Sequence, residues 1–446
     1  MSAVVTGVTI GSIGFNTCKY LAALGFRVIM VARNEEKGLD AKLKILEDDF
    51  HADLQVVVGD VSDFDGIKNH LIEDIREAAG GTWLALLVNN AGMISNDGQQ
   101  TLKTNYTGPY LLTELLLPTM LRFWDSSSSS FAASASASSS SSVSKIKKWV
   151  CQKCDKVKTD IAPTNNHKHQ LYSECHYCAI KTKFIGLDQK EADAKNLGDK
   201  NSFGEGLTAA TLFDGEKEAE EFDTPAKREA LLAQLKRQQK YVGFPRVVNV
   251  SSLFHLFATS EPDKNKVEKI INEMNKNNNN NNTIPKPETK IEKHLLIANS
   301  SSKKPNGSYS VSKLCNQMHA MNLALRFAKS HGLVAVSLHP GMVRSAIWSF
   351  AFGASSLKNM FSFSNLFQQM FFKSLTNGTQ TSLQCCIQAV RNVHVVPDVN
   401  GVSMNGKYYA DCQEVPFTVD NPACKMKELD ALESWTRNQQ LKEYLI

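Results

Sequence analysis

The stretch Val4-Val-Thr-Gly-Val-Thr-Ile-Gly-Ser-Ile-Gly14 decides the fold of this chain. Val4–Thr6 is predicted to be a buried strand, and the helical pattern Asn16–Leu24, closed by Gly25, follows the glycine-rich turn. A turn of this kind lets backbone N–H groups approach a pyrophosphate at the start of a helix. The stretch therefore predicts the first strand–turn–helix unit of a dinucleotide-binding sheet.

Strand and helix patterns alternate through residues 1–122 in the manner of a doubly wound parallel sheet. Further strands are predicted at Arg27–Ala32, Gln55–Val58, Leu84–Val88 and Arg246–Ser252. The helix around Thr107–Leu121 is apolar on nearly all sides, as expected of a helix packed against a sheet or a partner subunit. The fold class expected is α/β.

Two changes in composition interrupt this pattern. Residues 126–144 are largely Ser and Ala, so 123–243 is interpreted as an insertion with a Ser-rich linker and a cysteine-rich segment at 145–184. Residues 259–303, which carry Asn277–Asn282, are interpreted as an Asn-rich low-complexity insertion. The remaining parts, 1–122, 244–258 and 304–446, amount to about 280 residues, an ordinary size for one α/β domain.

Further motifs follow the glycine-rich turn in order along the chain. They are Asn89-Asn-Ala-Gly92, Asn105-Tyr-Thr-Gly108, Val248-Asn-Val-Ser-Ser252, Tyr309-Ser-Val-Ser-Lys313 and Pro340-Gly341. Tyr309 and Lys313 share one helix face, where the ammonium can lower the pKa of the phenol and make it a proton donor near neutral pH. The ordered series resembles the short-chain dehydrogenase/reductase family, which implies a Rossmann-type doubly wound parallel sheet.

The resemblance also implies a catalytic set. Tyr309 would be the general acid/base that protonates a carbonyl oxygen while hydride arrives from the nicotinamide, and Lys313 would lower its pKa and bind the nicotinamide ribose. Ser252 would orient the substrate oxygen, and the family spacing favours it over the adjacent Ser251. Asn105 would hold a helix kink and a water that relays protons. Near the end, Gly378–Ser382 and Gly406–Cys412 resemble the retinol-dehydrogenase-like branch.

The glycine-rich turn departs from the family pattern TGxxxGxG because it reads TGxxxGxxG, one residue longer. Either Gly7 and Gly11 keep their places and Gly14 is displaced, or Ser12 stands where the middle glycine belongs. Each glycine has a steric role, so the extra residue weakens the expectation of normal cofactor binding. A loop that only joins a strand to a helix is the alternative.

The cofactor is expected to be NADP. The second strand ends at Arg33 with no acidic residue to accept the ribose 2′-OH of NAD, and an arginine offers a bidentate fork to a 2′-phosphate. An ordinary solvated arginine is the alternative. Asp60 matches the family position that contacts adenine. The resemblance assigns to the cofactor Gly7, Gly11, Ser12, Ile13, Gly14, Arg33, Asp60, Val61, Asn89, Ala91, Gly92, Tyr309, Lys313, Pro340, Gly341 and Ser345.

The segment after Ser345, from Ala346 to Phe372, is rich in Phe and aliphatic residues. In the family this region forms the substrate lid, and its apolar bias implies a small lipophilic ketone, aldehyde or alcohol as substrate. A core or dimer helix is an alternative, and peripheral contact with a bilayer is another. Dimers or tetramers are usual in the family, so a homo-oligomer is expected.

Two cysteine pairs stand apart from these motifs. Cys151, Cys154, Cys175 and Cys178 form C-x₂-C, twenty intervening residues and C-x₂-C, the spacing at which four thiolates close a tetrahedral Zn²⁺ site. The sequence therefore predicts a structural zinc in a zinc-ribbon-like segment. Nine lysines make this segment basic, which fits either a nucleic-acid or acidic partner or a solvated loop.

Bulk properties set the remaining expectations. The chain starts almost directly on a strand and contains no apolar run of membrane-spanning length, so neither a signal peptide nor a transmembrane segment is expected. Ten cysteines without a secretory signal indicate a reducing, cytoplasmic location, and the net charge of +5 is mild. An NADP-dependent oxidoreductase is the leading hypothesis. The competitor is an adaptor protein whose reductase fold has lost turnover and whose zinc ribbon recruits a partner.

Overall fold

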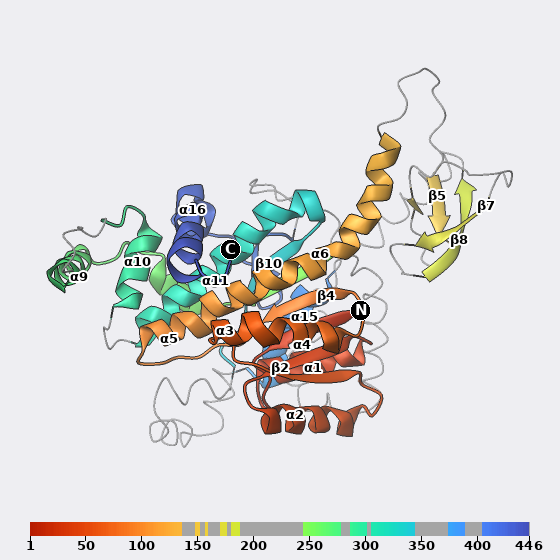
Figure 1. Cartoon of the computed structure of the whole chain (residues 1–446), viewed down its shortest axis with the longest axis horizontal. Helices are drawn as coiled ribbons and strands as arrows, with labels where there is room; N and C mark the ends of the chain where they lie inside the picture. The colour runs from red at the N-terminus through yellow and green to blue at the C-terminus, as the bar shows by residue number, and fades with distance from the viewer. Residues whose placement is uncertain are drawn as a thin grey trace. The chain divides into compact units, whose positions relative to one another are not determined.

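The computed structural model describes residues 1–135, 148–151, 157–158, 170–175, 180–187, 244–277, 286–300, 305–343, 373–388 and 404–445. The chain divides into two compact units. The first comprises Met1–Asp125, Phe244–Cys386 and Arg391–Ile446, and the second comprises Ser126–Gly243 and Ile387–Val390. Figure 1 shows the helices and strands of each.

The first unit is built on an eight-stranded sheet in the order β12-β11-β10-β9-β4-β1-β2-β3. Its strands are β1 (Ser2–Thr6), β2 (Arg27–Ala32), β3 (Leu54–Val58), β4 (Leu84–Asn89), β9 (Arg246–Val250), β10 (Val334–His339), β11 (Tyr408–Ala410) and β12 (Gln413–Glu414). All neighbours pair in parallel except β12, which is antiparallel to β11. The predicted Rossmann-like α/β sheet is confirmed, because the chain winds outward from β1 in one direction and from β4 in the other.

Helices and helical turns connect these strands. They are α1 (Ile13–Ala23), α2 (Glu35–Asp48), α3 (Phe64–Gly66), η1 (Ile67–Leu71), α4 (Ile72–Ala79), α5 (Gly98–Leu102), η2 (Lys103–Thr107), α6 (Gly108–Ala135), η5 (Leu253–Ala258), α9 (Lys264–Asn277), α10 (Lys290–Asn299), α11 (Pro305–His331), α15 (Leu375–Ile387), η6 (Pro422–Cys424), α16 (Met426–Trp435) and η7 (Thr436–Gln440). The helix predicted at Asn16–Leu24 is α1, which begins three residues earlier.

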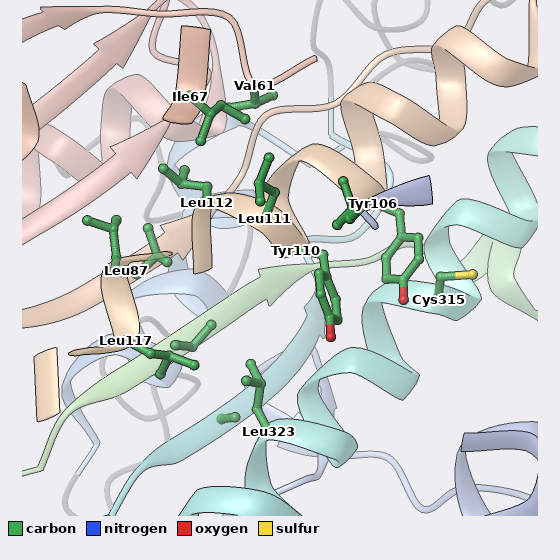
Figure 2. Close-up of a cluster of buried hydrophobic side chains, with 14 of the residues drawn as sticks. Val61, Ile67, Leu87, Tyr106, Tyr110, Leu111, Leu112, Leu117, Cys315 and Leu323 are labelled. Carbon is green, nitrogen blue, oxygen red and sulfur yellow. The ribbon is translucent and has the colours of Figure 1, made fainter. Parts of the chain in front are cut away.

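The two faces of the sheet are covered by different helices. Ile29 and Val31 of β2 belong to the main apolar cluster. Figure 2 shows part of this cluster, including leucines of α6 and α11. Side chains alternate along a strand, so Ala32 lies on the opposite face. There α2 approaches so closely that a Cβ on Gly38 would lie 3.1 Å from the Cβ of Ala32. The sheet is thus buried on both faces, as its nearly continuous apolar strands require.

The second unit contains a four-stranded antiparallel sheet in the order β6-β5-β8-β7. Its strands are β5 (Lys148–Cys151), β6 (Val157–Lys158), β7 (Gln170–Cys175) and β8 (Ile180–Leu187). β5 ends at Cys151, which is opposite Phe184, and β7 ends at Cys175, which is opposite Ile180. Because β8 begins at Ile180 and pairs with both strands, β5 and β7 end toward the same end of β8.

The low-complexity interpretation of residues 259–303 is wrong for its carboxyl-terminal part. Residues 290–299 form α10, in which Ile291 and Leu295 are fully buried. A capping box between Thr289 and Glu292 begins this helix. The carboxylate of Glu428, from α16, accepts from the backbone N–H groups of Lys290 and Ile291 at 3.0 and 2.8 Å. α10 is therefore an integral helix of the first unit.

Candidate active site

The candidate site lies where the direction of chain winding reverses. The glycine-rich turn leaves the carboxyl end of β1, and the turn Asn89–Gly92 leaves the carboxyl end of its neighbour β4. In open α/β sheets, ligands bind in the crevice between two such strand ends. The topology therefore brings the two turns predicted for the cofactor to one place.

The glycine-rich turn needs its glycines for two reasons. Gly7 and Gly11 have φ angles of +74° and +78°, in the left-handed region that favours glycine. Gly14 has no such angle, but a Cβ there would lie 2.5 Å from Nδ2 of Asn90 and 2.9 Å from the carbonyl oxygen of Gly7. Gly14 therefore permits the close packing of α1 against the sheet.

Ser12 occupies the remaining special position of the turn. It is the N-cap of α1, has a φ of −104° and accepts the backbone N–H of Phe15 at 3.1 Å. Gly14 fulfils the packing role of the last glycine in the family pattern TGxxxGxG. The geometry therefore favours the alignment in which Ser12 stands in the place of the middle glycine of that pattern. The first backbone N–H groups of α1 have no intrahelical partner, which leaves a helix start suited to an anion.

Asn90 joins the two turns, a role that the sequence analysis missed. Its Nδ2 donates to the carbonyl oxygens of Thr6 at 2.8 Å and Gly7 at 3.3 Å. The backbone N–H groups of Asn90 and Ala91 donate to Oγ1 of Thr6 at 3.1 and 3.0 Å. The sequence signal for this role was the pair Asn89-Asn90, which places a polar side chain directly after a buried strand.

The side chain of Asn89 is buried and makes its hydrogen bonds within the fold. Its side chain is 4% exposed, and its Nδ2 donates to Oγ1 of Thr113 and to Oδ1 of Asn249, both at 2.9 Å. The amide thus ties β4 to α6 and β9. The expectation that Asn89 supports the nicotinamide-side ribose stays a prediction, and the observed contacts of this side chain are structural.

Ser252 and Tyr309 meet at the carboxyl end of β9. Both are buried, at 8% and 7% exposed, and the Ser252 side chain is close enough to the Tyr309 hydroxyl to lower its pKa. The hydroxyl of the neighbouring Ser251 donates instead to the carbonyl oxygen of Lys313 at 2.6 Å, which fixes α11 to the sheet. The geometry therefore agrees with the choice of Ser252 over Ser251.

Lys313 lies beside the same pair. Its Nζ donates to the carbonyl oxygen of Val250 at 2.9 Å and lies 5.5 Å from the centroid of the Tyr309 ring. A Cβ on Gly92 would lie 3.3 Å from this Nζ and 3.5 Å from Oδ1 of Asn105. Gly92 thus permits a close approach of β4's turn to both side chains.

Asn105 lies in the π-helical turn η2, which interrupts the regular helix between α5 and α6. Its Oδ1 accepts the backbone N–H of Met93 at 2.7 Å, and its Nδ2 donates to the Met93 carbonyl at 2.9 Å and to Oγ of Ser312 at 3.0 Å. A π-turn is a local irregularity of the kind the sequence analysis expected at this residue. Asn105 joins the Asn89–Gly92 turn to α11.

The expected lowering of the Tyr309 pKa is wrong for this structure. Burial raises the pKa of Tyr309 to about 12, and the hydrogen bond with Ser252 opposes that shift only in part. Burial also lowers the pKa of Lys313 to about 8, because the apolar surroundings disfavour its charge. The Lys313 ammonium is bound to the Val250 carbonyl, and burial decides both shifts.

Other predicted cofactor residues are more dispersed. Arg33 is exposed just after β2, and Asp60 accepts the backbone N–H and hydroxyl of Ser62 at 2.7 and 2.8 Å. Val61 is buried, and its carbonyl oxygen would lie only 1.6 Å from a Cβ on Gly108. Pro340 and Gly341 follow β10 directly. Ser345 and the apolar segment up to Phe372 lie outside the described residues.

The structure does not describe the side chains of the four predicted zinc ligands. Cys154 and Cys178 lie outside the described residues, and Cys151 and Cys175 are described only as strand ends. Elsewhere in the described chain, no group of three or more His, Cys, Asp or Glu could hold a metal ion. The same described residues contain no helix that is both long and apolar enough to span a bilayer. The zinc site stays a prediction.

Comparison with known proteins agrees with the motifs. Residues 1–147 match the short chain dehydrogenase family. Human polyprenol dehydrogenase is 33% identical over 125 residues, which cover 26% of this chain and 37% of that protein. Mouse retinol dehydrogenase 12 is 33% identical over 108 residues, which cover 24% of this chain and 28% of that protein. The chain thus matches about a third of the length of these relatives.

Among solved structures, the NADPH-bound carbonyl reductase from chicken fatty liver is 15% identical, with 94% of each chain covered and a TM-score of 0.44. A likeness at this level does not bear on cofactor or substrate. The family model matches the first third of the chain, and the relatives that match include a retinol dehydrogenase and a polyprenol dehydrogenase.

Proposed function

We propose, from the short-chain dehydrogenase match of residues 1–147, that this chain is an NADP-dependent oxidoreductase that reduces a lipophilic ketone or aldehyde, or oxidises the corresponding alcohol. One observation carries the proposal. Ser252, which follows β9, meets Tyr309 and Lys313 of α11 as buried side chains beside Gly92 and Asn105. Buried titratable groups with shifted pKa values and a shared polar contact are characteristic of catalytic sites.

The residues present fit a dinucleotide. Gly7 and Gly14 bring the turn and the start of α1 close to the sheet, and a Cβ on Gly11 would meet no atom within 4 Å, so the space beside it is open. The backbone N–H groups at the start of α1 would bind the pyrophosphate. When bound, the nicotinamide supplies or accepts the hydride.

The side chains of this site would handle the proton. In carbonyl reduction the Tyr309 hydroxyl would donate its proton to the substrate oxygen, and the Ser252 hydroxyl would hold that oxygen in place. With a pKa raised to about 12 by burial, Tyr309 is protonated at neutral pH and is ready to act as an acid. The charged Lys313, next to Gly92, would bind the ribose and stabilise the tyrosinate that forms.

The choice of NADP rests on Arg33, which is exposed directly after β2. The end of this strand has no acidic residue to accept the ribose 2′-OH of NAD. We expect Arg33→Ala to weaken NADPH binding about tenfold or more, because it removes a charge-assisted bidentate contact to the 2′-phosphate. NADH binding should change little. The measurement is titration of each nucleotide by nicotinamide fluorescence.

NADH is the internal control for this variant, since it lacks only the 2′-phosphate. Equal affinity of the wild-type chain for NADPH and NADH would contradict NADP preference. Binding of neither nucleotide would remove the oxidoreductase proposal and favour the adaptor alternative.

We also propose that the four cysteines of the second unit bind a structural zinc. The positions at which two of its strands end support this proposal. β5 and β7 flank β8 and end at Cys151 and Cys175, toward the same end of β8, so each C-x₂-C pair begins where one of these two strands ends. We expect about one zinc per purified chain by mass spectrometry of metals. Replacing Cys151 and Cys175 by Ser should abolish it, whereas replacing the exposed Cys424 should not. A zinc-free wild-type chain would contradict the proposal.

A further inference from the structure

An apolar surface lies directly beside the candidate catalytic residues. The helical turn η5 begins immediately after Ser252, whose side chain accepts the backbone N–H of Phe254 at 3.3 Å. Three of its apolar side chains are strongly exposed: Leu253 at 49%, Leu256 at 47% and Phe257 at 72%. Large exposed apolar side chains gathered on one short element are typical of a binding surface.

The turn η5 is held firmly from beneath. His255 is buried, its Nδ1 lies 2.7 Å from the Ser252 carbonyl oxygen, and its ring lies edge-on to the Tyr408 ring at a centroid distance of 5.0 Å. Just beyond the turn, Nζ of Lys290 donates to the Thr259 carbonyl at 2.8 Å. The exposed side chains therefore stand on an anchored element, and their exposure does not come from a loose loop.

Aromatic rings connect this surface with Tyr309. The Phe254 ring lies edge-on to the Tyr309 ring, with centroids 5.9 Å apart, and edge-on to the Phe257 ring at 5.6 Å. Phe254 is half-buried and Phe257 is exposed, so the row of rings runs from the candidate proton donor outward to the surface. A ligand whose reacting oxygen lies at Tyr309 would have this row beside it.

We propose that the apolar surface formed by Leu253, Phe254, Leu256 and Phe257 binds the hydrocarbon chain of the substrate. The inference rests on the proposed function and narrows it to carbonyl compounds or alcohols with an extended apolar chain. Burial of such a chain releases water from both surfaces, and each fully buried methylene strengthens binding about fourfold. The six residues of η5 carry no acidic side chain and no lysine or arginine, and their histidine is buried, so the surface offers no charge to a polar substrate.

A lipid bilayer is the other occupant that exposed phenylalanine and leucine could fit. The row of rings argues for the substrate, because it begins at a buried tyrosine inside the site, where a bilayer surface does not reach. The full chain distinguishes the two in a test with free ketones and with vesicles.

The test compares butan-2-one with decan-2-one by equilibrium dialysis in the presence of NADP, for the wild-type chain and two variants. Phe257→Ser removes the outermost ring of the surface. Phe50→Ser is the matched control, because Phe50 is 83% exposed and lies in the turn before the edge strand β3, four strands away from β9. We expect decan-2-one to bind the wild type at least about tenfold more tightly than butan-2-one. Phe257→Ser should lose most of that difference, and Phe50→Ser should keep it.

Each outcome decides one claim. Equal binding of the two ketones by the wild type, or a preference that Phe257→Ser retains, overturns the inference. Binding to phosphatidylcholine vesicles that depends on Phe257, with no ketone preference, overturns it in favour of a membrane surface. A Phe257-dependent preference without turnover of either ketone by NADPH leaves the apolar site standing and removes the oxidoreductase proposal.

Discussion

Tyr309→Phe should lower kcat for carbonyl reduction by about a thousandfold while leaving NADPH binding unchanged. The variant removes only the hydroxyl, which general acid catalysis requires and which typically contributes two to four orders of magnitude. The ring that packs edge-on to Phe254 remains, so the shape of the site is kept. The measurement is NADPH oxidation at about pH 7, below the pKa of about 8 that burial gives Lys313, so that its ammonium is charged.

Tyr110→Phe is the matched control for this variant. Tyr110 is also buried, but its hydroxyl donates to Glu433 at 2.8 Å, away from Ser252 and Lys313. Because the acceptor is a carboxylate, loss of that bond should cost about 2 kcal/mol of stability, and turnover should stay within a few-fold of wild type. Turnover of Tyr309→Phe within tenfold of wild type would exclude Tyr309 as the proton donor.

Gly108→Ala should lower the free energy of unfolding by about 3 kcal/mol, the largest stability effect that we expect from a single methyl group. A Cβ there would lie 1.6 Å from the Val61 carbonyl oxygen and 2.7 Å from its carbon. Both are backbone atoms, so the first turn of α6 must shift away from the segment after β3. The measurement is urea unfolding of the variant and the wild type under the same conditions.

The control for Gly108→Ala is Gly307→Ala. Gly307 also lies in the first turn of a long helix, but a Cβ there would meet no atom within 4 Å. Alanine should therefore be neutral or stabilise by about 0.5 kcal/mol through its better helix propensity. If the two variants have equal stability, the contact between Gly108 and Val61 does not constrain the fold.

The sheet could be predicted because its strands are short apolar runs bounded by turns. Arg27–Ala32 was predicted with its observed bounds, and Leu84–Val88 falls one residue short of β4. Buried parallel strands show this pattern more plainly than helices show theirs. Helix α1 illustrates the contrast, because its first turn contains Gly14, which propensity alone would place outside a helix.

The order of motifs could predict which residues meet, but not how each side chain is bonded. Ser252 and Tyr309 meet as expected, whereas Asn89 bonds to Thr113 and Asn249, and the neighbouring Asn90 joins the two turns. The choice between adjacent identical amides depends on which one points into the sheet. That direction follows from the strand's register, which a single sequence does not specify.

Two errors have definite physical origins. Helix α10 was missed because the neighbouring asparagine tract dominated the composition, although Thr289 and Glu292 carry the spacing of a capping box. The pKa of Tyr309 was predicted from its charged neighbour alone, whereas burial has the larger effect. Burial at one position depends on residues from distant parts of the chain, so it could not be read from a five-residue motif.

The pairing of β4 with β9 has a consequence for synthesis of the protein. Arg246 follows Asn89 by 157 positions, so the ribosome needs about ten to thirty seconds to supply the partner strand after β4 has emerged. During that interval the open edge of a β1–β4 half-sheet displays unpaired backbone groups, a template for association with other nascent chains. The long insertion costs little closure entropy in the finished fold, but it prolongs the period in which this strand edge is exposed.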